Sequence, residues 1–154
     1  MIRILMVCLG NICRSPLAHG ILESQLPKSS FFVDSAGTAA YHVGNKPDPR
    51  SIEVANKYGI TIHQQRARQF VASDFDTFDY IYAMDASNYN NIISLAKTNE
   101  DFGKVKLILE DNPSILDKNV PDPYYGGPDG FEHVYDLISS TSELLAERLK
   151  QKHL

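Results

Sequence analysis

The residues of this chain with the clearest chemical potential are Cys8 and Arg14, which are separated by five residues near the N-terminus. A cysteine thiolate is a strong nucleophile, and a planar guanidinium can bind two oxygens of a tetrahedral oxyanion. Ser15 follows directly, and its hydroxyl could donate a hydrogen bond to the Cys8 sulfur when sulfur is a leaving group. A thiolate beside a site for a tetrahedral anion predicts nucleophilic phosphoryl transfer.

The elements around these residues predict a strand, a turn and a helix. Residues 2–7 are apolar apart from Arg3, as in a strand that is buried on both faces of a parallel sheet. Pro16 fits the first turn of a following helix, because the N–H group it lacks has no partner there. Such a turn directs backbone N–H groups at one point beside a helix N-terminus, where anions bind and a thiolate is favoured.

The residues between the strand and the helix are suited to such a turn. Gly10 permits backbone angles that a side chain would forbid, and Asn11 tolerates left-handed geometry. The predicted phosphate-binding loop comprises Leu9, Gly10, Asn11, Ile12, Cys13 and Ser15.

A second candidate element lies far along the chain, where Asp122 stands between two prolines. Its carboxyl group could protonate the departing ester oxygen and later activate water. Tyr124 and Tyr125 follow, and they offer aromatic faces for a substrate ring. Because phosphotyrosine reaches a deep thiolate more easily than the shorter phosphoserine, an aryl phosphate is the expected substrate.

Taken together, these elements resemble the low-molecular-weight protein tyrosine phosphatases. The resemblance spans nearly the whole chain, through the 8–16 loop and the segments 34–37, 47–50, 67–68, 78–80, 84–85 and 122–125. It implies that Ser35 joins Asn11 and Ser15 in a network that shapes the loop, and that Tyr41 walls the substrate cleft. Gln65 stands where many relatives have a histidine in this network, so tuning by a histidinium is expected to be absent.

The expected reaction has two steps. The Cys8 thiolate attacks phosphorus while Arg14 and the loop N–H groups stabilise the equatorial oxygens, and Asp122 protonates the leaving group. Water then hydrolyses the phosphocysteine with Asp122 as base. No metal or other cofactor is expected, because Arg14 and the N–H groups take that role. A disulfide between Cys8 and Cys13 is expected after oxidation, since a loop around one phosphate brings the two together.

The bulk composition agrees with one enzyme domain over residues 1–154. Of its residues 43% are apolar and 22% charged, and a net charge of −4 argues against nucleic acid or an anionic membrane as partner. No signal peptide or membrane span is expected, and two cysteines in one loop fit a cytoplasmic protein without zinc. The expected partners are phosphotyrosine proteins or small aryl phosphates, and the expected state is a monomer or weak dimer.

The order of apolar segments predicts an α/β fold with a four-stranded parallel sheet, helices on both faces and a flavodoxin-like three-layer architecture. The predicted strands are 2–7, 31–33, 80–84 and 105–109. The predicted helices are 16–26, 49–58, a short one from 73, 86–95, and a last one containing 131–149. Residues 97–104 are expected to be a polar connection, and 112–128 a long functional loop.

Two functions of other classes compete with this one. An arsenate reductase can share this fold and cysteine loop, but its chemistry uses further cysteines, and none follows Cys13. A catalytically silent module that binds phosphorylated ligands would be expected to lose the nucleophile or the acid, whereas Cys8 and Asp122 are both present.

Overall fold

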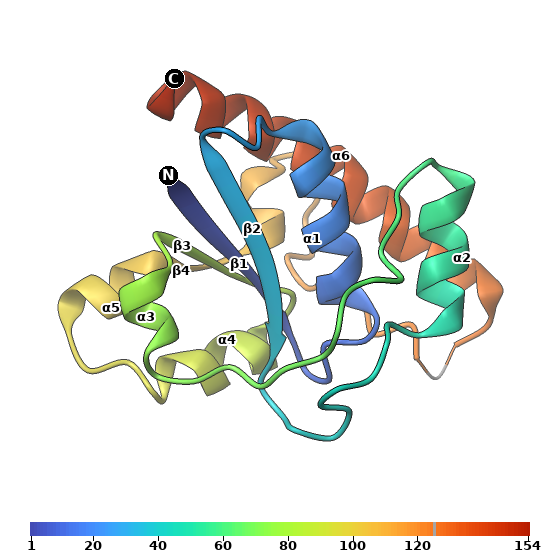
Figure 1. The fold of residues 1–154 in the computed structure, drawn as a ribbon, viewed down its shortest axis with the longest axis horizontal. Coiled ribbons are helices and arrows are strands. Elements are labelled where there is room, and N and C mark those ends of the chain that lie inside the picture. Colours follow the sequence, from blue (N-terminus) through green and yellow to red (C-terminus); the bar gives the residue numbers. More distant parts are fainter. Residues whose placement is uncertain (125) are drawn as a thin grey trace.

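A parallel sheet forms the middle layer of the molecule (Figure 1). The computed structural model describes residues 1–124 and 126–154. Within them, four strands run in the order β2-β1-β3-β4, with β1 at Ile2–Cys8, β2 at Phe31–Gly37, β3 at Tyr80–Ala83 and β4 at Val105–Leu107. All pairs are parallel, which confirms the predicted fold class.

The central strand β1 separates two hydrophobic cores. Its alternate residues Ile4 and Met6 belong to the core beneath helices α1 (Arg14–Gln25), α2 (Pro49–Lys57) and α6 (Pro128–His153). Leu5 and Val7 belong to a second core with residues of α3 (Asp74–Thr77) and α4 (Ala86–Ile93). Because successive side chains of a strand point to opposite faces, a strand covered on both sides must be apolar throughout. The two cores confirm the three-layer arrangement.

Strand β2 is longer than predicted, because residues 34–37 continue the pairing with β1. Gly37 lies opposite Cys8 at the end of this pair. A Cβ at Gly37 would lie 2.8 Å from the Leu9 carbonyl oxygen, so only glycine lets the phosphate-binding loop approach this closely. The polar residues Asp34 and Ser35, which are typical of a turn, are instead in the strand.

Most of the predicted helices are found with small shifts at their ends. Helix α1 begins at Arg14 rather than Pro16, and α2 begins at Pro49 after its N-cap Asp48, whose carboxylate accepts from the Arg50 N–H at 2.8 Å. Gly59 follows the end of α2 with a φ of 79°, a left-handed conformation suited to glycine.

The region after β3 contains two elements that the sequence pattern did not predict. Helix α5 (Asn99–Lys104) lies within the expected polar connection. Thr98 accepts from the Asp101 N–H at 3.1 Å, and the Asp101 carboxylate accepts from the Lys97 N–H at 3.0 Å, so the two side chains cap this helix reciprocally. Strand β4 ends at Leu107 and is followed by a 3₁₀ turn, η1 (Ile108–Asp111).

Two observations bear on metal and membrane binding. Among the described residues, no group of three or more His, Cys, Asp or Glu side chains is placed to hold a metal ion. In that same part of the chain no helix has the length and apolar character that crossing a membrane requires.

Candidate active site

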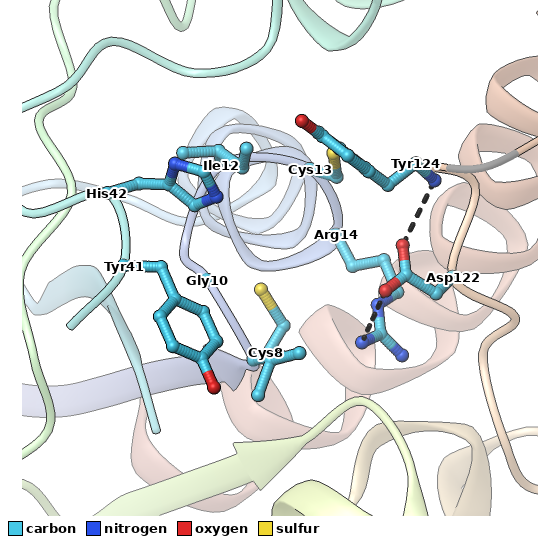
Figure 2. Close-up of a pocket in the computed structure, with 10 residues that line it drawn as sticks. Cys8, Gly10, Ile12, Cys13, Arg14, Tyr41, His42, Asp122 and Tyr124 are labelled. Atoms are coloured by element: carbon cyan, nitrogen blue, oxygen red, sulfur yellow. Dashed lines mark hydrogen bonds and ion pairs between the residues drawn. The ribbon is translucent and has the colours of Figure 1, made fainter. Parts of the chain in front are cut away.

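The phosphate-binding loop forms the floor of a pocket of about 290 Å³ at the carboxyl end of β1 (Figure 2). Ligands of parallel α/β sheets bind at this edge, where loops from several strands meet. The pocket is lined by Cys8, Leu9, Gly10, Ile12, Cys13, Arg14, Tyr41, His42, Asp122 and Tyr124. The fold thus brings Cys8, Arg14 and Asp122 together, although Asp122 is more than 100 residues from the loop in sequence.

Cys8 is buried at the pocket floor, and its sulfur lies 3.0 Å from the Ser15 hydroxyl oxygen. The same oxygen accepts a hydrogen bond from the Asn11 side-chain amide at 2.8 Å. Because Asn11 supplies the donor in that bond, the Ser15 proton is available for the sulfur, and the Ala36 carbonyl at 3.5 Å is a poorer acceptor. This arrangement leaves the Ser15 hydroxyl free to donate to the Cys8 sulfur.

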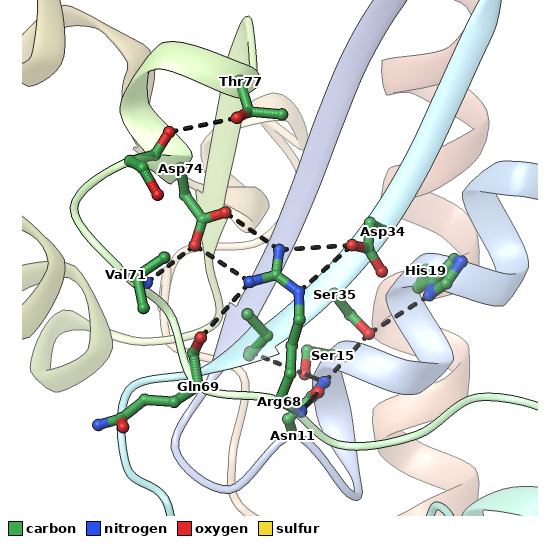
Figure 3. Close-up of polar contacts among 12 residues, drawn as sticks. Asn11, Ser15, His19, Asp34, Ser35, Arg68, Gln69, Val71, Asp74 and Thr77 are labelled. Atoms are coloured by element: carbon green, nitrogen blue, oxygen red, sulfur yellow. Dashed lines mark hydrogen bonds and ion pairs between the residues drawn. The ribbon is translucent and has the colours of Figure 1, made fainter. Parts of the chain in front are cut away.

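Asn11 holds the loop in its curved shape. Its φ of 57° places it in the left-handed region, which costs a non-glycine residue about 1–3 kcal/mol. Three hydrogen bonds offset this strain: the amide nitrogen donates to Ser15 and, at 3.0 Å, to Ser35, while the amide oxygen accepts from the Arg68 N–H at 3.0 Å (Figure 3). Ser35 therefore lies in the network that shapes the loop.

Arg14 is a buried cation that is fixed at one nitrogen. Its Nη1 donates to the Asp85 carboxylate at 2.6 Å and to the Val120 carbonyl at 2.9 Å, whereas Nη2 lies 3.7 Å from the Asp122 carboxylate. Burial alone would lower the pKa of Arg14, but the Cys8 sulfur and then Asp85 raise it above its ordinary value. The guanidinium is therefore charged and oriented before any ligand binds.

Asp85 contacts the site residue Arg14, although sequence reasoning assigned it only to a helix cap. It does cap α4, because its Oδ1 accepts from the Asn88 N–H at 2.8 Å, but its Oδ2 holds Arg14. Its place two residues after β3, at the same sheet edge as Cys8, was the available signal.

Asp122 lies on the exposed side of the pocket. Its side chain is 38% exposed, and its Oδ1 accepts from the Tyr124 N–H at 3.0 Å. The Arg50 guanidinium donates to the Tyr124 carbonyl at 3.2 Å and lies over the Tyr124 ring, 5.6 Å from its centroid. Tyr125 lies outside the described residues.

Aromatic rings form the walls at the pocket mouth (Figure 2). His42 lies between Tyr41 and Tyr124, with ring centroids 6.5 Å and 6.4 Å away. A Cβ at Gly10 would come within 3.0 Å of the His42 ring, so the glycine provides the space that this ring occupies. His42 was not predicted as a site residue, although its position next to Tyr41 in the loop was a signal.

Cys13 is the second thiol of the loop, and both cysteines are free and buried. Burial, followed by the negative charges of Asp48 and Cys8, raises the pKa of Cys13 to about 12. Cys13 is therefore a neutral thiol at ordinary pH, which distinguishes it from a nucleophile.

The polar network is contacted by an imidazole that comes from a different part of the chain from Gln65. The amide nitrogen of Gln65 donates to the Pro16 carbonyl at 3.1 Å, and its amide oxygen has no hydrogen-bond partner in the described part of the chain. Instead His19, on α1, lies 3.3 Å from the Ser35 hydroxyl through its Nδ1. The residue that contacts the network comes from a different element from the one the pattern indicated.

Comparisons with known proteins find relatives over nearly the whole chain. The sequence profile described as "Low molecular weight phosphotyrosine protein phosphatase" matches residues 3–154. The chain is similar to the protein of that name from Schizosaccharomyces pombe, at 47% identity over 147 residues, covering 92% of this chain and 93% of the other.

Two solved structures are similar in fold. The protein tyrosine phosphatase of Entamoeba histolytica with Hepes in the active site has a TM-score of 0.93 and 35% identity, and all of both chains is covered. Vibrio vulnificus Wzb in complex with benzylphosphonate has a TM-score of 0.86 and 31% identity, covering 96% of this chain and 99% of that one.

Proposed function

Because this chain belongs to the low molecular weight phosphotyrosine protein phosphatases, a family of hydrolases, we propose that it hydrolyses phosphotyrosine and small aryl phosphomonoesters through a phosphocysteine on Cys8. One observation carries the proposal. The Cys8 sulfur lies at the floor of a pocket that Arg14 and Asp122 also line, with the Ser15 hydroxyl 3.0 Å away. Nucleophile, oxyanion site and acid thus share one cavity.

In the first step the Cys8 thiolate attacks phosphorus, and an S–P bond forms as the P–O ester bond breaks. The equatorial oxygens bind the backbone N–H groups of the loop and the Arg14 guanidinium, whose Nη1 is already held by Asp85 and Val120. Donors that are fixed in advance stabilise the transition state without the cost of reorganisation.

Asp122 supplies the proton that the departing phenolate needs. The Asp122 carboxyl, in its protonated form, donates to the leaving oxygen, while Nη2 of Arg14, which lies 3.7 Å from Asp122, binds a phosphate oxygen. In the second step water attacks phosphorus, Asp122 accepts the proton of that water, and the S–P bond breaks. The Ser15 hydroxyl then stabilises the departing thiolate of Cys8.

The pocket walls support an aryl substrate. Tyr41, His42 and Tyr124 surround the mouth, and a planar ring between them would bury aromatic surface. The similar Vibrio vulnificus protein was solved with benzylphosphonate, a compound with an aromatic ring and a tetrahedral phosphonate. Tyr125 stays a predicted contact of the substrate. The proposed chemistry uses no metal or other cofactor.

The test is hydrolysis of an aryl phosphate by wild type and by Cys8→Ser, together with vanadate binding to both. We expect turnover in wild type only and vanadate binding in both, because the cradle consists of backbone groups and Arg14. Undiminished hydrolysis by Cys8→Ser would remove Cys8 as nucleophile. Binding of phosphotyrosine by wild type without turnover would indicate a silent binding module instead.

A further inference from the structure

His19 is a titratable side chain that the proposed reaction does not use, yet it touches the network behind the nucleophile (Figure 3). It lies on α1, and its side chain is only 13% exposed. Its Nδ1 is 3.3 Å from the Ser35 hydroxyl oxygen, and its Nε2 is 3.3 Å from the Glu23 carboxylate. The two ring nitrogens thus have partners of different kinds.

The hydrogen-bond pattern selects one tautomer of His19. The Ser35 oxygen already accepts from the Asn11 amide at 3.0 Å, so the Ser35 proton needs an acceptor of its own. Among the described residues the only other side-chain partner of Ser35 is the Nδ1 of His19. The proton of the neutral ring is then on Nε2 and points to Glu23, whose pKa this hydrogen bond lowers. In this tautomer every one of these donors has an acceptor.

The orientation of Ser35 bears on the nucleophile through Asn11. The amide nitrogen of Asn11 has two protons, of which one goes to Ser35 and the other to Ser15. The donation to Ser15 in turn leaves the Ser15 proton for the Cys8 sulfur. If Ser35 lost its acceptor and turned its own proton toward Asn11, one of the bonds that hold this left-handed residue would be lost.

We propose that His19 is a positioning residue for the nucleophile: by accepting the Ser35 proton, it fixes the Asn11 amide and hence the hydrogen bond from Ser15 to Cys8. The inference rests on the proposed function and adds a residue to it. His19 is anchored on its outer side by Glu23, near Lys28. On the side of the sheet, Figure 3 shows Asp34 and Arg68, which form an ion pair with each other, in the region of Ser35.

Two substitutions of His19 distinguish the loss of its hydrogen-bond acceptor from a change in side-chain volume. His19→Asn can place an amide oxygen near the position of Nδ1, whereas His19→Leu fills similar space without an acceptor. Ser35→Ala removes the proton that His19 accepts. His153→Leu is the matched control, because His153 is also partly buried and bonded to a hydroxyl, that of Tyr80 at 2.8 Å, but is far from the pocket.

The experiment measures the rate of iodoacetate alkylation of Cys8 against pH, with the modified cysteine identified by mass spectrometry, and kcat and KM for an aryl phosphate. For His19→Leu we expect the pH midpoint of alkylation to rise by about half a unit and kcat to fall about 3- to 10-fold, the size of one weakened hydrogen bond. KM should change less than about twofold, because phosphate contacts are unchanged. His19→Asn should recover most of the loss.

Non-additivity gives the sharpest criterion. If His19 acts through Ser35, the double variant His19→Leu with Ser35→Ala should be no worse than Ser35→Ala alone. Additive losses, equal behaviour of the Leu and Asn variants, or the same shift in His153→Leu would each overturn the inference. So would unchanged alkylation and kcat in His19→Leu. Failure of the proposed function is distinguishable, since wild type would then lack turnover while the alkylation profiles still report on Cys8.

Discussion

The two parts of the pocket differ in how firmly they are held. In the phosphate-binding loop, Asn11 and Arg14 are each 2% exposed, and Ser15 is fully buried. Asp122, by contrast, is 38% exposed at its side chain and lies in a segment without regular structure. Its link to Arg14 is an ion pair of 3.7 Å, whereas Arg14 holds Asp85 at 2.6 Å.

This difference matches what the proposed reaction requires of each part. An oxyanion site is effective when its dipoles are fixed before the reaction, so burial and hydrogen bonding improve it. A general acid must exchange its proton with solvent in every cycle, so an exposed carboxyl is better suited to that task. The same fold thus provides a rigid cradle and an exposed carboxyl, the proposed acid, within one cavity.

The largest effect is expected from Arg14→Lys, which changes the rigid part of the pocket. An ammonium cannot reproduce both the bonds to Asp85 and Val120 and the two-oxygen contact with phosphate. We expect kcat for an aryl phosphate to fall about 10³-fold. Steady-state kinetics test this, with thermal unfolding as a control for folding. A near-normal rate for the Lys variant would contradict the role of Arg14 in the transition state.

A smaller and selective effect is expected from Asp122→Asn in the exposed part. General acid help matters only for leaving groups that depart poorly without a proton, so esters of basic phenols should slow about 10²-fold and activated esters far less. A leaving-group series measures this, and the alkaline limb of the pH–rate profile should disappear. Equal losses across the series would count against Asp122 as the acid.

Cys13 provides a test inside the rigid loop, with an effect that depends on pH. Its pKa is raised to about 12 by burial, and an attack on oxidised Cys8 requires the thiolate. As long as the pH stays below 12, each rise of one pH unit should therefore increase the rate of disulfide formation after peroxide treatment about tenfold. Non-reducing mass spectrometry between pH 7 and 9 measures it. The activity of Cys13→Ser after the same dose should not be restored by a thiol, and full recovery would make Cys13 a packing residue only.

The smallest effect is expected at Asp48, which connects the two parts of the pocket through hydrogen bonds. The Asp48 N–H donates to the Ile12 carbonyl of the loop at 2.8 Å, and its carboxylate binds Arg50, which holds the Tyr124 carbonyl. Asp48→Ala removes the cap of α2 and should lower the free energy of unfolding by about 1 kcal/mol, while Asp48→Asn keeps the cap and removes the charge.

The pH dependence of this effect has a definite sign. Burial opposes the charge of Asp48, but its bonds to Arg50 lower the pKa of Asp48 below the ordinary value. The charge therefore stabilises the fold above the pKa of the unfolded state, about 4, and this stability is lost as pH falls through the lower folded value. Chemical denaturation measures the free energy of unfolding of wild type and Asp48→Asn. The difference between the two proteins should be smaller at pH 3 than at pH 7. A constant difference would exclude the charge as its cause.

Local sequence patterns determined a large part of this protein. The apolar run before Cys8 predicted the central strand, because a strand covered on both faces has no position for polar residues except at its ends. Asp48 and Pro49 predicted the start of α2, since a helix cap depends on the conformation of neighbouring residues. These features need no partner from a distant segment.

Only the tertiary structure decided which distant residues complete the site. Asp85 was assigned to a cap and also holds Arg14 across 71 residues, while His19 rather than Gln65 brings an imidazole to Ser35. Ser35 itself lies in a strand because residues 34–37 pair with β1. A side chain that serves two partners looks the same in sequence as one that serves a single local partner. Contacts between segments depend on strand order and register, which local spacing does not encode.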